Sequence, residues 1–281
     1  MNTQQQKVKS PRFESFESNK YDANHKTFLC YKSNSYLGYL KITRLKIAQY
    51  IIFVFFTSIC FSLTSCVSLK QYPLESYSWA APEVRQFEAL DKSIEYPNDA
   101  ILFIGSSSIR LWNTIEEDMK PFPVIKRGYG GAHFRDMVFY TDRILANHSP
   151  EMIVCFVAND IKGVPEDESP KKVLCLIKYF IKQVREQHPS IPLAFIEITP
   201  TSSRWKQWND IEEVNRLVKE LCARKEGLYF VSTANAFLDE EGKPNDSLFI
   251  SDRLHLNPEG YAVWNQLIKS EIIRIKKVNS L

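Results

Sequence analysis

From about residue 95 onward, short apolar runs alternate with longer segments in which apolar residues recur every three or four positions. The short runs predict strands, and several are apolar at consecutive positions, as in strands covered on both faces. These strands are expected at residues 100–105, 122–128, 152–157, 193–198 and 228–232. Amphipathic helices are expected at residues 134–147, 170–188, 210–227 and 258–277. This alternation predicts an α/β fold, a three-layer α/β/α sandwich around a mostly parallel five-stranded sheet.

The first 66 residues show a different pattern. Residues 1–40 are polar and lack an apolar period, which predicts a disordered tail or a start assigned too far upstream. Residues 41–66 combine a basic patch, an apolar stretch and small residues, as secretory signals do. The end of this segment, Leu-Thr-Ser-Cys, resembles a bacterial lipobox. The resemblance implies that Cys66 is acylated and anchors the chain to a membrane of the cell envelope. The alternative is a signal anchor retained as one transmembrane helix, which Gln49 and the Ser and Thr content disfavour.

Composition and charge narrow the class of protein. The chain is 44% hydrophobic and 25% charged, an ordinary globular composition, and residues 67–94 fit a linker and lead-in helix before a domain at 95–281. A net charge of +3 without a basic stripe argues against a nucleic-acid partner. No metal-ligand spacing occurs, so we expect neither a metal nor another cofactor. Cys155, Cys175 and Cys222 are expected to be free thiols among apolar neighbours.

The residues that follow each predicted strand are the candidates for chemistry, because ligands of a parallel sheet bind beyond the carboxyl ends of its strands. The first strand is followed by three serines, Ser106, Ser107 and Ser108. A hydroxyl at the start of the next helix would lie beside free backbone N–H groups, which suits a nucleophile whose attack creates an oxyanion. Serine is also a preferred N-cap, so this stretch alone favours a helix cap.

Three further loops carry candidate residues. The glycine loop at 128–133 can present backbone N–H groups, and His133 breaks the G-x-G-x-x-G pattern of dinucleotide sites. Asn159 follows the third strand, where its amide can donate to an oxyanion or form a local turn. Asp252 and His255 are three positions apart, a spacing that lets the carboxylate reach Nδ1 and leaves Nε2 free. Taken alone, each of these candidate residues has a plain structural explanation. Taken together, they place complementary groups on one edge of one sheet.

This combination resembles the SGNH, or GDSL-type, hydrolases over about residues 99–275, which implies a flavodoxin-like sheet. The family's Gly-Asp-Ser motif falls on Gly105, Ser106 and Ser107. The resemblance therefore implies that Ser107 is the nucleophile and that Ser106 replaces the usual Asp. The last block of the family, Asp-x-x-His, is intact at Asp252 and His255.

The two middle blocks of the family are altered in this chain. In the second block Gly131 is kept, whereas Lys126 stands where the family has Asn. In the third block Asn159 is kept, whereas Val157 replaces a glycine. All four functional residue types of the family survive, so the resemblance implies an active enzyme.

The family mechanism, carried onto this sequence, is that of a serine esterase. It implies that His255 takes the proton of Ser107, that Asp252 orients His255, and that Ser107 attacks an ester carbonyl to form an acyl-enzyme. It also implies that the oxyanion is held by the backbone N–H groups of Ser107 and Gly131 and by the Asn159 amide.

The substrate is less constrained than the mechanism. The extracytoplasmic address and the aromatic residues near the site, Tyr129, Trp205 and Trp208, favour short acyl groups, above all O-acetyl groups on carbohydrate. Core packing is the competing explanation for each aromatic residue. A lysophospholipase, lipase or thioesterase is an alternative, disfavoured because no long apolar lid is present. A non-catalytic glycan-binding lipoprotein is another, motivated by the two altered blocks.

Overall fold

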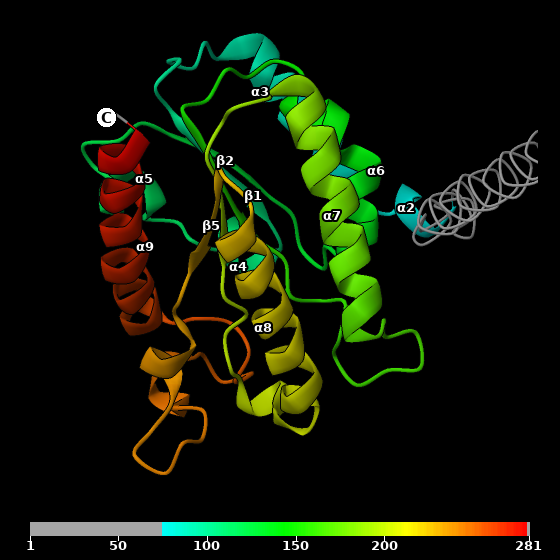
Figure 1. Ribbon diagram of the computed structural model, residues 1–281, viewed down its shortest axis with the longest axis vertical. Helices are drawn as coiled ribbons and strands as arrows, with labels where there is room; N and C mark the ends of the chain where they lie inside the picture. Colours follow the sequence, from blue (N-terminus) through cyan, green and yellow to red (C-terminus); the bar gives the residue numbers. More distant parts are fainter. Residues whose placement is uncertain (1–74, 280–281) are drawn as a thin grey trace, which may run out of the picture. The chain divides into compact units, whose positions relative to one another are not determined.

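A computed structural model of the chain describes residues 75–279 (Figure 1). The expected tail, the signal and the lipidated Cys66 lie outside these residues. Among the described residues, no helix combines the length and hydrophobicity that a membrane span requires.

A parallel sheet of five strands lies at the centre of residues 75–279, and its order is β2-β1-β3-β4-β5. The strands are β1 (Ile101–Gly105), β2 (Val124–Gly128), β3 (Met152–Phe156), β4 (Leu193–Ile196) and β5 (Leu228–Val231). All five predicted strands are confirmed. The strand order reverses between β1 and β3, and in such sheets the crevice at the carboxyl ends of these two strands is the usual ligand site.

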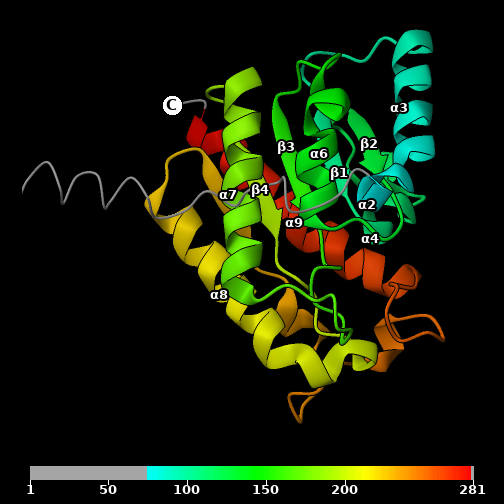
Figure 2. The same ribbon diagram turned by 90° about the vertical axis from the view of Figure 1, so that its right-hand side faces the viewer.

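Helices cover both faces of the sheet (Figures 1 and 2). One face carries α2 (Glu75–Ser78), α3 (Ala81–Ser93), α6 (Phe134–Leu145), α7 (Pro170–Gln187) and α8 (Trp208–Arg224). The other face carries α4 (Ser107–Arg110), α5 (Ile115–Asp118) and α9 (Pro258–Asn279). Short 3-10 helices lie at η2 (Ser202–Gln207), η3 (Ala234–Phe237) and η4 (Asp246–Leu248). The predicted three-layer sandwich is confirmed.

The alternation of side chains along β1 builds a separate core on each side of the sheet. Leu102 and Ile104 pack in the core beneath α6, α7 and α8, whereas Ile101 and Phe103 pack in the core beneath α9. All five residues of β1 are buried. Full burial of each such side chain contributes about 1.5–3 kcal/mol to folding, so the strand that leads to the three serines is firmly held.

The last helix begins directly after the loop that carries Asp252 and His255. Asn257 precedes Pro258, and its side-chain Oδ1 accepts a hydrogen bond of 2.9 Å from the Gly260 N–H. A capping amide followed by proline fixes a helix start. The helix α9 thereby anchors one end of the Asp252–His255 loop.

Candidate active site

A turn that only glycine can make directs the chain from β1 into the serines. Gly105 has a φ of +146°, and a Cβ there would lie 1.9 Å from the backbone oxygen of Phe156 in β3. Helix α4 then begins at Ser107. Ser106 and Ser108 are buried, whereas Ser107 is half-buried. Ser107 is therefore the most accessible of the three serines.

The imidazole of His255 joins Ser107 to Asp252. Its Nε2 lies 2.9 Å from Ser107 Oγ, and its Nδ1 lies 2.6 Å from Asp252 Oδ2. A carboxylate only accepts hydrogen bonds, so Nδ1 carries the ring proton and Nε2 presents a lone pair to the hydroxyl. The structure thus brings together the three residues predicted as nucleophile, base and orienting acid, in the geometry that proton transfer requires.

The Asp252 carboxylate is held by its own loop. Its Oδ1 accepts hydrogen bonds from the backbone N–H groups of Leu254 (2.9 Å) and His255 (3.0 Å). Burial alone would raise the pKa of Asp252, but the hydrogen bonds from the His255 ring and from these N–H groups outweigh it and lower the pKa. Between the two residues, Arg253 adopts a left-handed φ of 53°, a costly conformation for a residue with a side chain. The loop therefore stores strain to place Asp252 opposite Nδ1.

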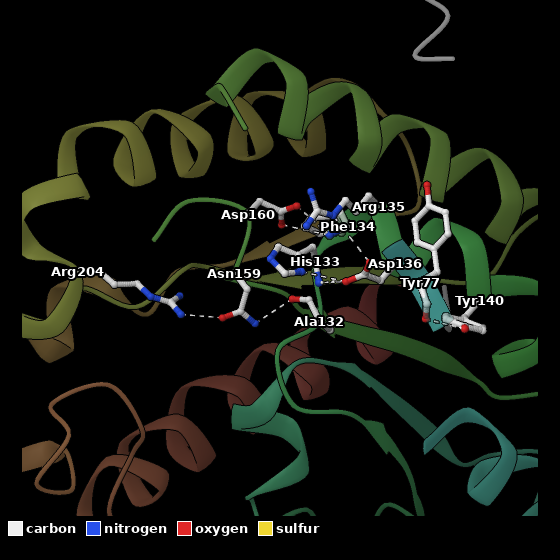
Figure 3. A network of polar contacts seen from close by, with 10 residues as sticks. All are labelled: Tyr77, Ala132, His133, Phe134, Arg135, Asp136, Tyr140, Asn159, Asp160 and Arg204. Atoms are coloured by element: carbon white, nitrogen blue, oxygen red, sulfur yellow. Dashed lines mark hydrogen bonds and ion pairs between the residues drawn. The ribbon is translucent and has the colours of Figure 1, made fainter. Parts of the chain in front are cut away.

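Asn159 lies at the carboxyl end of β3, where its amide bridges two neighbours (Figure 3). Its Nδ2 donates to the backbone oxygen of Ala132 (2.9 Å), and its Oδ1 accepts from Arg204 (2.7 Å). Ala132 follows Gly131, which has a φ of +75° and is exposed in the glycine loop after β2. The amide therefore ties β3 to the loop that carries the predicted oxyanion N–H.

A buried carboxyl group supports the same loop from behind. Both oxygens of Asp160 accept the N–H of Phe134, at 3.0 and 3.2 Å, and so fix the first residue of α6 (Figure 3). One position earlier, the N–H of His133 donates to Asp136 (3.0 Å). Burial raises the pKa of Asp160 to about 6, although the nearby His133 and the Phe134 N–H oppose this shift. The exit from the glycine loop is thus held by two carboxyl groups.

A small cavity lies beside the Ser107 hydroxyl. Its volume is about 20 Å³, and its polar lining includes Ser107, His255, Asn159, Arg204, Thr199 and Thr201. Since a water molecule needs roughly 10–15 Å³ of such volume, the cavity holds one group of about that size. Leu256 lines this cavity and also a larger groove of about 550 Å³, which contains Asn113 and Tyr261.

The structure corrects one of the aromatic residues expected to contact substrate. Tyr129 is fully buried in the core, so its ring offers no surface to a ligand. Trp205 is half-buried, stacks on Trp208 with ring centroids 5.7 Å apart, and does not line the cavity. The exposed aromatic residue at the glycine loop is Trp79, which is 42% exposed and lies against Gly131.

The two residues that depart from the family pattern in its middle blocks, Lys126 and Val157, have structural roles. The Lys126 ammonium donates to the backbone oxygens of Arg110 (3.5 Å) and Trp112 (3.3 Å), at the end of α4. Cations are favourable at that end of a helix. Val157 is buried in the core on the α6 side. Both substitutions therefore fit the scaffold without entering the cavity beside Ser107.

Arg204 and Asp160 take part in the site, although the sequence analysis assigned neither of them a role. Both follow strands of the sheet, Arg204 in the loop after β4 and Asp160 directly after Asn159. Position beyond the carboxyl end of a strand was the available signal. That position alone does not show which residues beyond the strand ends point towards the site.

The fold and the site define an α/β protein with a serine, histidine and aspartate at the carboxyl edge of a parallel sheet, as in serine-dependent hydrolases. Residues 108–263 match the GDSL-like Lipase/Acylhydrolase family, and the chain belongs to this family. The match begins one residue after Ser107. It spans the positions of Gly131, Asn159, Asp252 and His255.

Solved structures share this fold. One is a GDSL-like lipase from Bacteroides thetaiotaomicron, with a TM-score of 0.57 and 16% identity over 68% of this chain and 98% of that one. Another is a carbohydrate esterase family 3 protein from Talaromyces cellulolyticus, with a TM-score of 0.51 and 14% identity over 64% and 98% of the chains. A third is a variant of an acetyl xylan esterase from Geobacillus stearothermophilus, with a TM-score of 0.50 and 14% identity over 62% and 94%. None of the curated proteins compared with the chain matches it.

Proposed function

We propose that this protein is a serine esterase that hydrolyses carboxylic esters through an acyl-enzyme. The observation that carries the proposal is the hydrogen-bonded series from Ser107 through His255 to Asp252, with distances of 2.9 and 2.6 Å. A hydroxyl, a base within reach of it and a group that orients the base make up an activated nucleophile. Membership in an acylhydrolase family supports the same reaction class.

In the proposed mechanism, His255 Nε2 takes the proton of Ser107 as Oγ attacks the ester carbonyl carbon. The oxyanion that forms accepts hydrogen bonds from the backbone N–H groups of Ser107 and Gly131 and from Asn159 Nδ2. The intermediate collapses, the carbon–oxygen bond to the alcohol breaks, and His255 returns its proton to the alcohol. A water molecule, deprotonated by His255, then releases the acid from Ser107.

The size of the cavity favours a short acyl group. A space of about 20 Å³ beside Ser107 suits the methyl group of an acetyl ester better than a long acyl chain. The groove of about 550 Å³ that shares Leu256 is large enough for a bulky alcohol. The exposed ring of Trp79 at the glycine loop suits stacking on a sugar. We therefore propose O-acetyl groups on carbohydrate as the substrate class.

We further propose that a lipid on Cys66 anchors this esterase to the cell envelope. The support is the basic, apolar and small-residue order of residues 41–66, which ends in the lipobox-like Leu63–Cys66. Growth with radiolabelled palmitate should label the wild-type protein and not Cys66→Ala. Equal labelling of the two, or none of either, would reject the anchor and leave the esterase proposal intact.

The test of the enzymatic function is hydrolysis of p-nitrophenyl acetate by the wild-type protein and by Ser107→Ala. We expect turnover by the wild type and loss of turnover in the variant. Equal rates would reject the mechanism and favour a binding protein.

A series of p-nitrophenyl esters from acetate to palmitate then tests which acyl group the enzyme prefers. The value of kcat/KM should be highest for acetate, and a maximum at long chains would favour a lipase or thioesterase instead.

A further inference from the structure

The amide of Asn159 is held from both sides by groups that do not belong to the Ser107, His255 and Asp252 series. Arg204 Nη2 donates to Asn159 Oδ1 at 2.7 Å, and Asn159 Nδ2 donates to the Ala132 oxygen at 2.9 Å (Figure 3). Asn159 is 8% exposed. The amide is therefore clamped rather than free to rotate.

The chemistry of the two neighbours allows only one orientation of this amide. A guanidinium has donors and no acceptor, so the atom of Asn159 that faces Arg204 must be the oxygen. The Ala132 carbonyl only accepts, so the atom that faces it must be the nitrogen. A flipped amide would set N–H against N–H and oxygen against oxygen. The Nδ2 group has two hydrogens, and the one not used by Ala132 remains for the cavity that Asn159 shares with Ser107.

Arg204 is itself fixed in place. Its Nη1 donates to the backbone oxygen of Ala158, so the guanidinium bridges two consecutive residues beyond β3. Its own backbone segment is tied to the loop of the candidate acid, because the Ser203 N–H donates to the Arg253 oxygen at 3.3 Å. Burial lowers the pKa of Arg204, and the Asp167 and Asp160 carboxylates oppose this. An arginine nevertheless remains a cation at any pH at which the protein is folded.

A cation on the amide oxygen also changes the strength of the amide as a donor. Hydrogen bonds to charged groups are roughly twice as strong as neutral ones, and bonds in a chain polarise one another. The positive charge at Oδ1 draws electron density from Nδ2. The remaining N–H of Asn159 thereby becomes a better donor to a negative oxygen.

We propose that Arg204 is a positioning residue for ester hydrolysis: it sets the orientation of the Asn159 amide and strengthens its hydrogen bond to the oxyanion. This rests on the proposed function, in which Asn159 stabilises that oxyanion. Arg204 also lines the cavity beside Ser107, but its Nη1 and Nη2 are engaged by the Ala158 and Asn159 oxygens, so its effect is assigned to the amide and not to a bond with the substrate. It follows that its effect belongs to kcat and disappears when Asn159 is removed.

The experiment compares Arg204→Met, Asn159→Ala and the double variant by hydrolysis of p-nitrophenyl acetate. Loss of one oxyanion donor costs about 10²–10³-fold in kcat, so Asn159→Ala should fall in that range. Arg204→Met should lose roughly 10- to 100-fold in kcat with little change in KM, because Asn159 remains but is misoriented. In the Asn159→Ala background the same change should cost less than about threefold.

A matched control and a conservative variant separate positioning from folding. Arg216→Met removes an exposed arginine that pairs with Glu213 and Glu220 on α8, and it should leave kcat unchanged. Arg204→Lys keeps one charged donor and should retain more activity than Arg204→Met. Guanidinium ion added to Arg204→Ala should restore part of its kcat. If Arg204→Met does not fold, as judged by circular dichroism, Arg204→Lys in both backgrounds gives the same test.

Three results would overturn the proposal. If the fold-losses in kcat of the two single variants multiply in the double variant, Arg204 acts independently of the Asn159 amide. A raised KM with unchanged kcat would show that Arg204 binds substrate directly. Wild-type kcat in Arg204→Met would show that the guanidinium is dispensable. Ser107→Ala is assayed in parallel as a test of the esterase function itself. If that function is wrong, Ser107→Ala hydrolyses the ester as fast as wild type; if only the role of Arg204 is wrong, Ser107→Ala is still inactive.

Discussion

His255 Nε2 lies 2.9 Å from Ser107 Oγ, although 148 positions separate the two residues in the chain. Ser107 is placed by the glycine turn after β1, and His255 by a loop whose backbone is closed by a hydrogen bond of 2.9 Å from the Ile250 N–H to the His255 oxygen. The positions of both side chains are thus set by the local backbone, and not by contacts of other flexible side chains. Conservative changes of the reacting atoms should therefore alter activity without unfolding the protein.

The first prediction separates Ser107 from its neighbour Ser108. Ser107→Ala removes the hydroxyl that faces His255, and kcat for p-nitrophenyl acetate should fall by about 10⁴-fold or more. Ser108 is buried, and it is its backbone oxygen that accepts the Tyr261 hydroxyl at 2.9 Å. Ser108→Ala leaves that bond in place, so kcat should stay within a few-fold of wild type. A larger loss in Ser108→Ala than in Ser107→Ala would move the nucleophile to Ser108.

The second prediction concerns the proton on His255. Asp252→Asn replaces the carboxylate that requires Nδ1–H by an amide that can donate to Nδ1 and so favour a proton on Nε2. The ring would then present an N–H to Ser107 and lose its basicity there, and kcat should fall by about 10²–10⁴-fold. Asp246→Asn, on a similarly exposed aspartate that pairs with Arg253, is the control and should remain close to wild type. Equal kcat in the two variants would remove Asp252 from the mechanism.

The third prediction follows from the buried Asp160. Its pKa is about 6 in the folded protein against an ordinary 3.8, so the folded state holds this proton over a range in which the unfolded chain has lost it. The stability that this proton contributes is fully present below about pH 4 and is lost as the pH rises through about 6. At 1.36 kcal/mol per pH unit, the loss is about 3 kcal/mol.

Asp160→Asn tests this linkage because its amide oxygen can still accept the Phe134 N–H while the side chain stays neutral. Urea denaturation from pH 4 to pH 8 should show the free energy of unfolding of the variant rising relative to wild type by up to about 3 kcal/mol. All other titrating groups are common to both proteins and cancel in the difference. A difference that is constant over this range would mean that Asp160 is ionised throughout.

Most of the fold was predictable because it follows from local periodicity. The five strands and the helices α6, α7, α8 and α9 each contain an apolar pattern long enough to identify. Helices α4 and α5 are four residues long and contain barely one turn, so no period could indicate them. The chemistry at the strand ends was predictable for the same reason, since the topology brings consecutive loops to one edge.

The direction of individual side chains was not predictable from these patterns. Tyr129 lies in the glycine loop directly after β2, and its position in the sequence gives no sign that the ring turns into the core. Arg204 reaches Asn159 across 45 positions, and no spacing links the two. Both placements depend on tertiary contacts. The same holds for the ion pair of Asp91 and Arg127, which joins α3 to β2.

That ion pair carries the fourth prediction. The Asp91 carboxylate contacts the Arg127 guanidinium and lies 3.2 Å from His148 Nε2, and each of these side chains is at most 2% exposed. The guanidinium also lies over the rings of Phe87 and Tyr96, at 5.4 and 5.1 Å from their centroids. Asp91→Ala leaves Arg127 as an unpaired buried charge, which should lower the free energy of unfolding by about 3–5 kcal/mol.

The half-buried pair of Glu88 and Arg143, which joins α3 to α6, provides the contrast. Glu88→Ala should cost about 1 kcal/mol, because water reaches this pair and screens it far more than the buried one. The double variant Asp91→Leu/Arg127→Met should be more stable than Asp91→Ala, since it removes the stranded charge together with its partner. Urea denaturation of the three variants measures this order. Equal losses for Asp91→Ala and Glu88→Ala would contradict it, because burial of the charge, rather than the presence of a salt bridge, is what sets the predicted cost.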